Sequence, residues 1–100
     1  MSIDMIEQQM KSRSMQFAGL NAVVKFDFGQ EGSLIVDGKT TPPAIGRTGP
    51  DPDTTLSISS GDFIKLSQGD LNPTMAFMTG KLKVSGNMGV AMKLSSMLED

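Results

Sequence analysis

The side chains that most enzymes use for nucleophilic or metal chemistry are largely missing from this chain. It contains no cysteine and no histidine, which excludes thiolate nucleophiles, disulfides, Cys/His zinc sites and every triad with a histidine base. Carboxylates such as Asp62 and Asp70 have no base or nucleophile beside them in a recognisable motif. Asp62 is better explained as a favourable charge near a helix N-terminus. We therefore expect a protein that is not an enzyme.

A cation site is a further type of chemistry that the acidic residues could support. The run Asp51-Pro-Asp53 resembles the start of a calcium loop, but its sixth position is Leu56 where such loops have glycine. We expect no metal and no cofactor.

Methionine is the one chemically distinctive residue type that is plentiful. All nine methionines lie in the first 15 residues or from Met75 onward. This flexible thioether adapts to irregular apolar ligands, and it also fills gaps in ordinary cores. The residues alone leave both interpretations open.

Composition limits the class of partner. A net charge of −2, a pI near 4.9 and the absence of tyrosine and tryptophan argue against nucleic acid, which is bound through clustered basic residues and stacking aromatic rings. No run of apolar residues approaches membrane-spanning length. The N-terminal residues are too acidic and too often interrupted by polar residues for a secretory signal. We expect a cytoplasmic protein that forms a single domain over residues 1–100.

The first half of the chain predicts one helix followed by strands. Apolar residues at Ile3, Ile6, Met10 and Phe17 share one helical face, so we expect a core-facing helix over residues 3–15. A helix that lies on a membrane surface is the alternative, although the polar face is not basic.

Alternating apolar residues then predict a series of half-buried strands. Their expected positions are residues 23–28, a second strand around Leu34 and Val36, a short edge strand at 44–47 within a proline-rich loop over 39–53, and a strand at 54–59.

The last third of the chain predicts three helices and one more strand. A short helix follows Ser59, and a second begins after Asn72, which can cap it, with Pro73 in the first turn. The sequence Lys-Leu-Lys-Val-Ser over 81–85 alternates like a strand, and a terminal helix follows Gly86 and Asn87. Because each strand has a single apolar face, all helices should pack on that side in two layers.

Residues 54–95 resemble the sterol carrier protein, or non-specific lipid-transfer, domain family. The resemblance rests on TTLSIS, on SGDFIKLSQGDLNP with its aspartate-aromatic pair and Asn-Pro turn, and on AFMTGKLKVSGNMGVAMKL with its Gly-Lys-Leu-Lys strand and Met-Lys-Leu helix. It implies an α+β fold: a five-stranded mixed, mostly antiparallel sheet with helices packed on one face. It also implies an apolar tunnel between the sheet and the helices.

Carried over by position, the residues that would line this tunnel are Phe63, Leu66, Met75, Phe77, Met78, Leu82, Val84, Met88 and Met92. The terminal helix would then act as a lid. Thr79 stands where related carriers often have glutamine, so the resemblance does not supply that polar anchor for a lipid head group.

The function implied is a non-catalytic carrier of fatty acyl chains, acyl-CoA or sterol-like lipids, with transient contact to a membrane during transfer. The alternative is an accessory interaction module without a lipid ligand of its own, which could form a homodimer through its Met-rich terminal helix.

Overall fold

A computed structural model describes residues 3–98 of the chain. The helix α1 (Ile3–Ser12) and a 3-10 turn η1 (Ser14–Phe17) precede strand β1 (Val23–Asp27). A second 3-10 turn, η2 (Gly29–Glu31), leads into β2 (Ser33–Asp37), β3 (Ala44–Gly46) and β4 (Thr54–Ile58). The remaining elements are α2 (Ser60–Ser67), α3 (Pro73–Met78), β5 (Leu82–Gly86) and α4 (Met88–Leu98).

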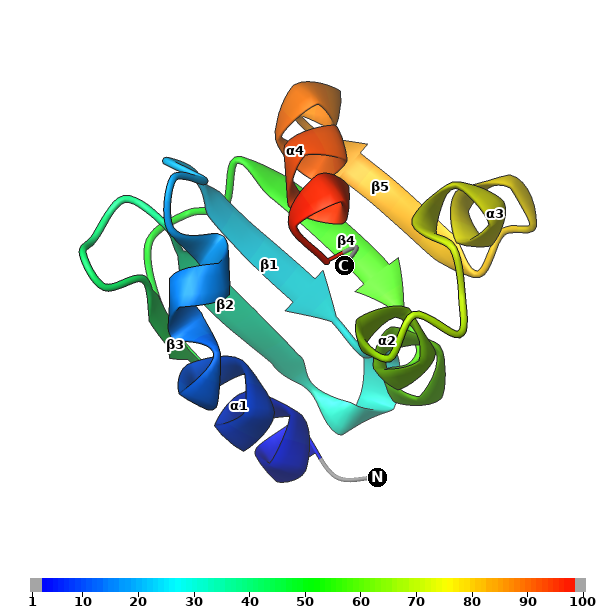
Figure 1. Cartoon of the computed structure of the whole chain (residues 1–100), viewed down its shortest axis with the longest axis horizontal. Helices are drawn as coiled ribbons and strands as arrows, with labels where there is room; N and C mark the ends of the chain where they lie inside the picture. The colour runs from blue at the N-terminus through cyan, green and yellow to red at the C-terminus, as the bar shows by residue number, and fades with distance from the viewer. Residues whose placement is uncertain (1–2, 99–100) are drawn as a thin grey trace.

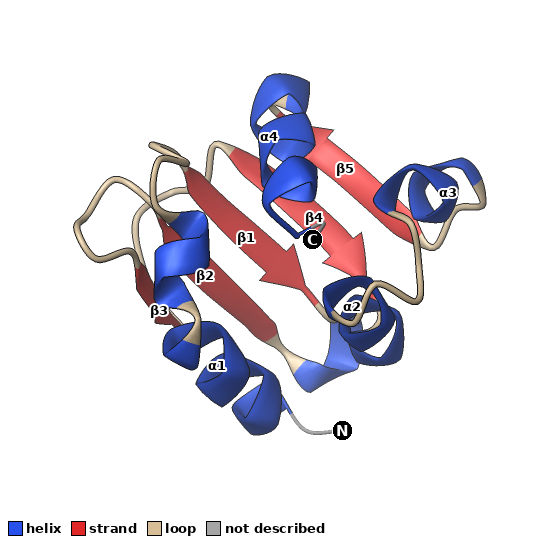
Figure 2. Cartoon of the chain, viewed as in Figure 1, coloured by secondary structure: helices blue, strands red, loops and turns tan. Residues whose placement is uncertain are grey.

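The described strands form one mixed sheet in the order β3-β2-β1-β4-β5. Only β1 and β4 run parallel, and the other neighbours are antiparallel. Figure 1 shows α1, α2 and α4 in front of the sheet and α3 beside β5, and Figure 2 shows the same arrangement by secondary structure. The predicted α+β architecture with helices on one face is therefore confirmed.

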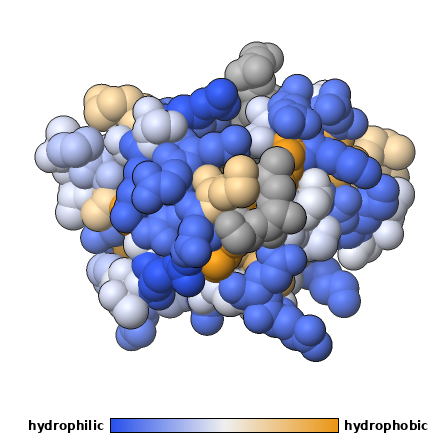
Figure 3. All heavy atoms as spheres, turned by 90° about the horizontal axis from the view of Figure 1, so that it is seen from below, coloured by the Kyte–Doolittle hydropathy of each residue, from blue (hydrophilic) through white to orange (hydrophobic). Residues whose placement is uncertain are grey.

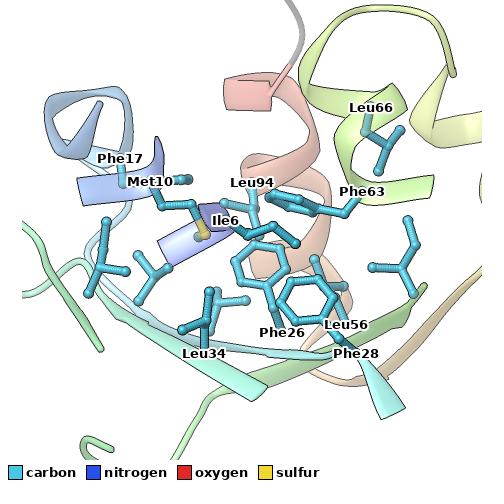
Figure 4. Packing of buried hydrophobic residues seen from close by; sticks show 14 of the residues in the cluster. Ile6, Met10, Phe17, Phe26, Phe28, Leu34, Leu56, Phe63, Leu66 and Leu94 are labelled. Carbon is cyan, nitrogen blue, oxygen red and sulfur yellow. The ribbon is translucent and has the colours of Figure 1, made fainter. Parts of the chain in front are cut away.

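The core lies between the sheet and the helices α1, α2 and α4. Phe63 of α2 meets Phe26 of β1 and Phe28, which directly follows β1, edge to face, with ring centroids 5.2 and 5.5 Å away, a favourable aromatic geometry. Figure 4 shows these rings beside Leu94 of α4 and Ile6 of α1. The first and last helices of the chain, α1 and α4, thus pack into the same core.

The N-terminal helix is shorter than predicted. The α-helix ends at Ser12, and the chain then tightens into η1, which still buries Phe17. Seven-residue spacing places Met10 and Phe17 on one helical face, so the pattern alone does not reveal this change of helix type.

The proline-rich loop crosses the outer face of the sheet. A Cβ atom at Gly49 would lie 2.9 Å from Ile35 of β2, which points away from the core. On this face Lys25 and Ser57 are half-buried, whereas Lys81, Lys83 and Ser85 are exposed. The outer face of the sheet is thus exposed to solvent at β5, and it is partly covered by the proline-rich loop at β2.

Candidate functional site

A groove of about 420 Å³ lies between α3, β5 and α4. Its lining is mainly apolar: Pro73, Thr74, Phe77, Leu82, Val84, Met88, Ala91, Met92, Ser95 and Ser96. None of these residues is charged, so the groove offers an apolar, electrically neutral surface with three hydroxyl groups.

The groove wall formed by α3 is fixed by its first turn. The side-chain oxygen of Asn72 accepts hydrogen bonds from the backbone N–H groups of Thr74 at 2.8 Å and Met75 at 3.3 Å. Pro73 follows the cap, where its missing N–H costs nothing. A six-residue helix is too short to be stable in isolation, so the cap and packing against β5 hold Phe77 in place.

The floor of the groove is the core-facing side of β5. Val84 pairs with Leu56 of β4, and Leu82 pairs with Ile58. Leu82 is buried, whereas Val84 is half-buried and faces the groove. The floor is therefore joined directly to the core.

The opposite wall is α4, and a glycine turn sets its start. Gly86 has φ of +102°, and a Cβ atom there would lie 2.7 Å from the carbonyl oxygen of Asp53. The side chain of Asn87 then accepts a hydrogen bond from the N–H of Val90 at 3.1 Å. Only glycine allows this close approach between β5 and the start of β4.

The walls leave apolar side chains open to solvent. Phe77 is 48% exposed, Met88 47% and Met92 69%. Burying such residues is favourable, so a ligand that covered them would gain apolar contact. The apolar lining thus forms a groove that is partly open to solvent.

Five of the nine predicted lining residues come together in this groove, namely Phe77, Leu82, Val84, Met88 and Met92. Phe63 and Leu66 instead lie buried in the core. Met75 and Met78 lie on the exposed surface of α3 and are not part of the lining.

Sequence reasoning missed the small and polar members of the lining. Ala91 and Ser95 lie three and seven residues after Met88, which places them on the same helical face. That spacing was available as a signal. Thr79, the position in question for a polar anchor, donates its hydroxyl hydrogen to the carbonyl of Met75 at 2.8 Å and lies outside the lining.

A second hollow, of about 360 Å³, lies by the outer side of β5. It is lined by Asp27, Phe28, Gly29, Ser57, Ile58, Ser59, Gly80, Lys81 and Lys83. Within residues 3–98 no cluster of three carboxylates suited to a metal ion is found. None of the helices in that range combines the length and hydropathy that crossing a bilayer requires.

Comparison with known proteins places these features in a family. A sequence profile described as "SCP-2 sterol transfer family" matches residues 3–99. A curated relative, hydroxysteroid dehydrogenase-like protein 2 of Xenopus laevis, is 44% identical over 71 residues, covering 69% of this chain. The chain spans only 17% of the length of that relative.

Solved structures agree with this match. Apo sterol carrier protein 2 of Yarrowia lipolytica is 31% identical with a TM-score of 0.72, over 95% of this chain and 84% of that one. Palmitated SCP2L2 of Aedes aegypti has the same fold at 24% identity, with a TM-score of 0.72 over 100% of this chain and 96% of that one.

Proposed function

The chain belongs to the SCP-2 sterol transfer family, and from that premise we propose that it is a non-catalytic carrier whose groove binds a fatty acyl chain. The observation that carries the proposal is the neutral apolar groove with half-exposed Phe77 and Met88. Its volume of about 420 Å³ lies in the range of small-molecule sites, about 300–1,000 Å³. SCP2L2 of Aedes aegypti, which has the same fold, was solved in a palmitated form, and this supports an acyl ligand.

The groove chemistry favours loose selection by chain length. An apolar lining recognises apolar volume more than functional groups, and flexible methionines adapt to different shapes. The hydroxyls of Thr74 and Ser96 can hydrogen-bond a polar head, while acyl-CoA or sterol-like lipids would need more room outside the groove. A fatty acid is therefore the ligand we propose first.

A chain-length series tests the proposal. Each methylene buried contributes about 0.8 kcal/mol, so the dissociation constant should fall about fourfold per added methylene and level off once the groove is full. Displacement of a fluorescent fatty acid from delipidated protein gives the constants, and native mass spectrometry gives the stoichiometry. No uptake at micromolar concentrations, or an affinity independent of chain length, would count against an acyl carrier.

A second function is favoured by the exposed methionines of α3 and α4 and by the small share of the curated relative that the chain covers. In that case the domain is an accessory module that pairs through α4 and has no lipid ligand of its own. Size-exclusion chromatography with light scattering separates the two. Loss of a dimer in Met92→Glu, with folding intact and no lipid uptake by the wild type, would favour the module.

A further inference from the structure

Two thioether side chains line the groove between α3, β5 and α4. Met88 and Met92 both belong to the lining, and they are 47% and 69% exposed. They lie four residues apart on α4, so they share one face of the helix and are separated by about 6 Å along its axis. An acyl chain bound in the groove would therefore contact two thioethers.

Methionine is the one residue type in this sequence that can reduce a peroxide by two electrons. Cysteine and methionine are the side chains that undergo this oxidation. The chain has nine methionines and no cysteine, and it also lacks histidine, tyrosine and tryptophan. A two-electron oxidation of the protein by a peroxide therefore takes place at a methionine.

The groove concentrates an acyl ligand against two of these methionines. One molecule confined to about 420 Å³ has a local concentration of about 4 M. Met15, Met75 and Met78 are also exposed, at 62%, 54% and 74%, but none of them lines the groove. The face of the molecule in Figure 3 is mostly hydrophilic with small apolar patches. A fatty acid derivative has no broad apolar surface there on which to gather.

We propose that the groove has a second activity, the reduction of a bound fatty acid hydroperoxide to the corresponding alcohol by Met88 or Met92. The inference rests on the proposed function, because the hydroperoxide is an oxidised form of the acyl ligand. The substrate class is an unsaturated fatty acid that carries an –OOH group on the part of the chain that lies in the groove.

The chemical step is the transfer of one oxygen atom. A lone pair of the methionine sulfur attacks the outer oxygen of the hydroperoxide, and the S–O bond forms as the O–O bond breaks. The hydroperoxide proton moves to the departing alkoxide oxygen. The thioether is oxidised by two electrons to a sulfoxide, and the hydroperoxide is reduced by the same two electrons to an alcohol. Sulfoxide and alcohol together account for every atom of the two reactants.

Two hydroxyl groups of the lining can carry that proton. Thr74 and Ser96 line the groove, and their hydroxyls have no hydrogen-bond partner within residues 3–98. Ser95, in contrast, donates its hydroxyl hydrogen to the carbonyl of Ala91 at 3.0 Å. A free hydroxyl can accept the hydroperoxide proton and donate its own hydrogen to the alkoxide. Proton transfer therefore needs no charged residue in this neutral groove.

The reaction weakens the binding site that performs it. A sulfoxide is polar, and an acyl chain that covers its oxygen removes a hydrogen-bond acceptor from water. We expect the oxidised protein to bind linoleic acid at least about fivefold more weakly than the reduced protein. The alcohol is therefore released, and each methionine reacts once until a sulfoxide reductase restores it.

Oxidation by two different peroxides tests the inference. Delipidated protein is treated, with a metal chelator present, with linoleic acid hydroperoxide below its micelle concentration or with hydrogen peroxide, and peptide mass spectrometry follows each methionine. We expect the fatty acid hydroperoxide to oxidise Met88 and Met92 at least about tenfold faster than Met15 and Met78. One hydroxy fatty acid should form per sulfoxide. Hydrogen peroxide has no acyl chain to hold it in the groove, so it should show no such preference.

Paired substitutions separate the groove methionines from the others. Met88→Leu with Met92→Leu removes both thioethers from the groove and keeps its apolar volume nearly constant. The matched control, Met75→Leu with Met78→Leu, removes two exposed methionines outside the lining. With each protein saturated by linoleic acid hydroperoxide, the groove variant should form alcohol at least about tenfold more slowly than the control. Equal rates in the two variants would overturn the inference.

Uptake of the hydroperoxide, measured by native mass spectrometry, separates this inference from the proposed function. Uptake that linoleic acid competes away, with Met15 and Met78 oxidised as fast as Met88 and Met92, refutes the reduction and leaves the carrier function intact. No uptake of linoleic acid or of its hydroperoxide refutes both. Selective oxidation of Met88 and Met92 that excess linoleic acid suppresses supports both.

Discussion

Val84→Asp is the substitution that tests the groove most directly. Val84 faces the groove from β5, the edge strand, and is only half-buried. Full burial of a valine side chain contributes about 1.5–3 kcal/mol, so we expect the substitution to cost roughly half of that in stability. The domain should therefore remain folded, which urea denaturation checks.

Ligand affinity should fall by more than stability. An acyl chain lying over the substituted position would remove the new carboxylate from water without a partner, since no basic residue lines the groove. Burial of an unpaired polar group costs about 1–3 kcal/mol in protein mutants. The dissociation constant of a long-chain fatty acid should thus rise by about 5- to 150-fold, as measured by displacement of a fluorescent probe.

Ser85→Asp is the matched control on the same strand. Ser85 is exposed, and its side chain points to the opposite face of the sheet, away from the groove. The two variants therefore share the new charge and the poor strand propensity of aspartate and differ in the face that carries the charge. We expect Ser85→Asp to bind fatty acid with nearly wild-type affinity. Wild-type affinity in folded Val84→Asp, or equal losses in both variants, would refute the groove as the binding site.

Three further outcomes follow from the fold. Gly86→Ala should lower the free energy of unfolding by about 1–3 kcal/mol, because the new Cβ atom would meet backbone atoms at a positive φ. Gly61→Ala in α2 places a Cβ atom with nothing within 4 Å and should raise the free energy of unfolding by about 0.5–1 kcal/mol. Urea titration measures both changes. Phe63→Leu should destabilise the core by about 1 kcal/mol yet change fatty acid affinity by less than about twofold, because Phe63 lies outside the groove. Hydrogen bonds from Lys11 and from Arg47 at 2.8 Å hold the pKa of Glu7 below its usual value. A carboxyl group whose pKa is lowered by folding stabilises the fold at pH values above its unfolded-state pKa, and this stabilisation is lost as the pH falls. Arg47→Gln should therefore lower the urea midpoint of unfolding at neutral pH and low salt. The difference between the variant and the wild type should vanish in acid.

The order and type of the elements could be predicted because local patterns determine them. The alternation at Leu82 and Val84 predicted a strand, which is β5. The cap at Asn72 predicted the start of a helix, which is α3. The parallel pairing of β1 with β4 has no signature in the alternation, which has a period of two in either direction. Only the family resemblance indicated a mixed sheet.

The site was harder to predict, because residue type does not reveal what a helix packs against. Phe63 and Phe77 are both aromatic residues on short helices with apolar faces. Phe63 meets the rings of Phe26 and Phe28 over the sheet, whereas Phe77 lies beside the edge strand and is 48% exposed. The position of each helix over the sheet separates core from groove, and that position depends on the whole chain.

The burial of α4 limits how a ligand can enter. Leu94 is 0% exposed, and the carbonyl of Met97 accepts a hydrogen bond from the side chain of Gln16 at 2.9 Å. A helix that swung away as a lid would expose Leu94 at a cost of about 1.5–3 kcal/mol for that side chain alone. Met88 and Met92 project from the same helix into the groove, and exposed side chains change rotamer within nanoseconds at little cost. If the groove is the binding site, we expect a ligand to enter by movement of these methionines while α4 stays in place.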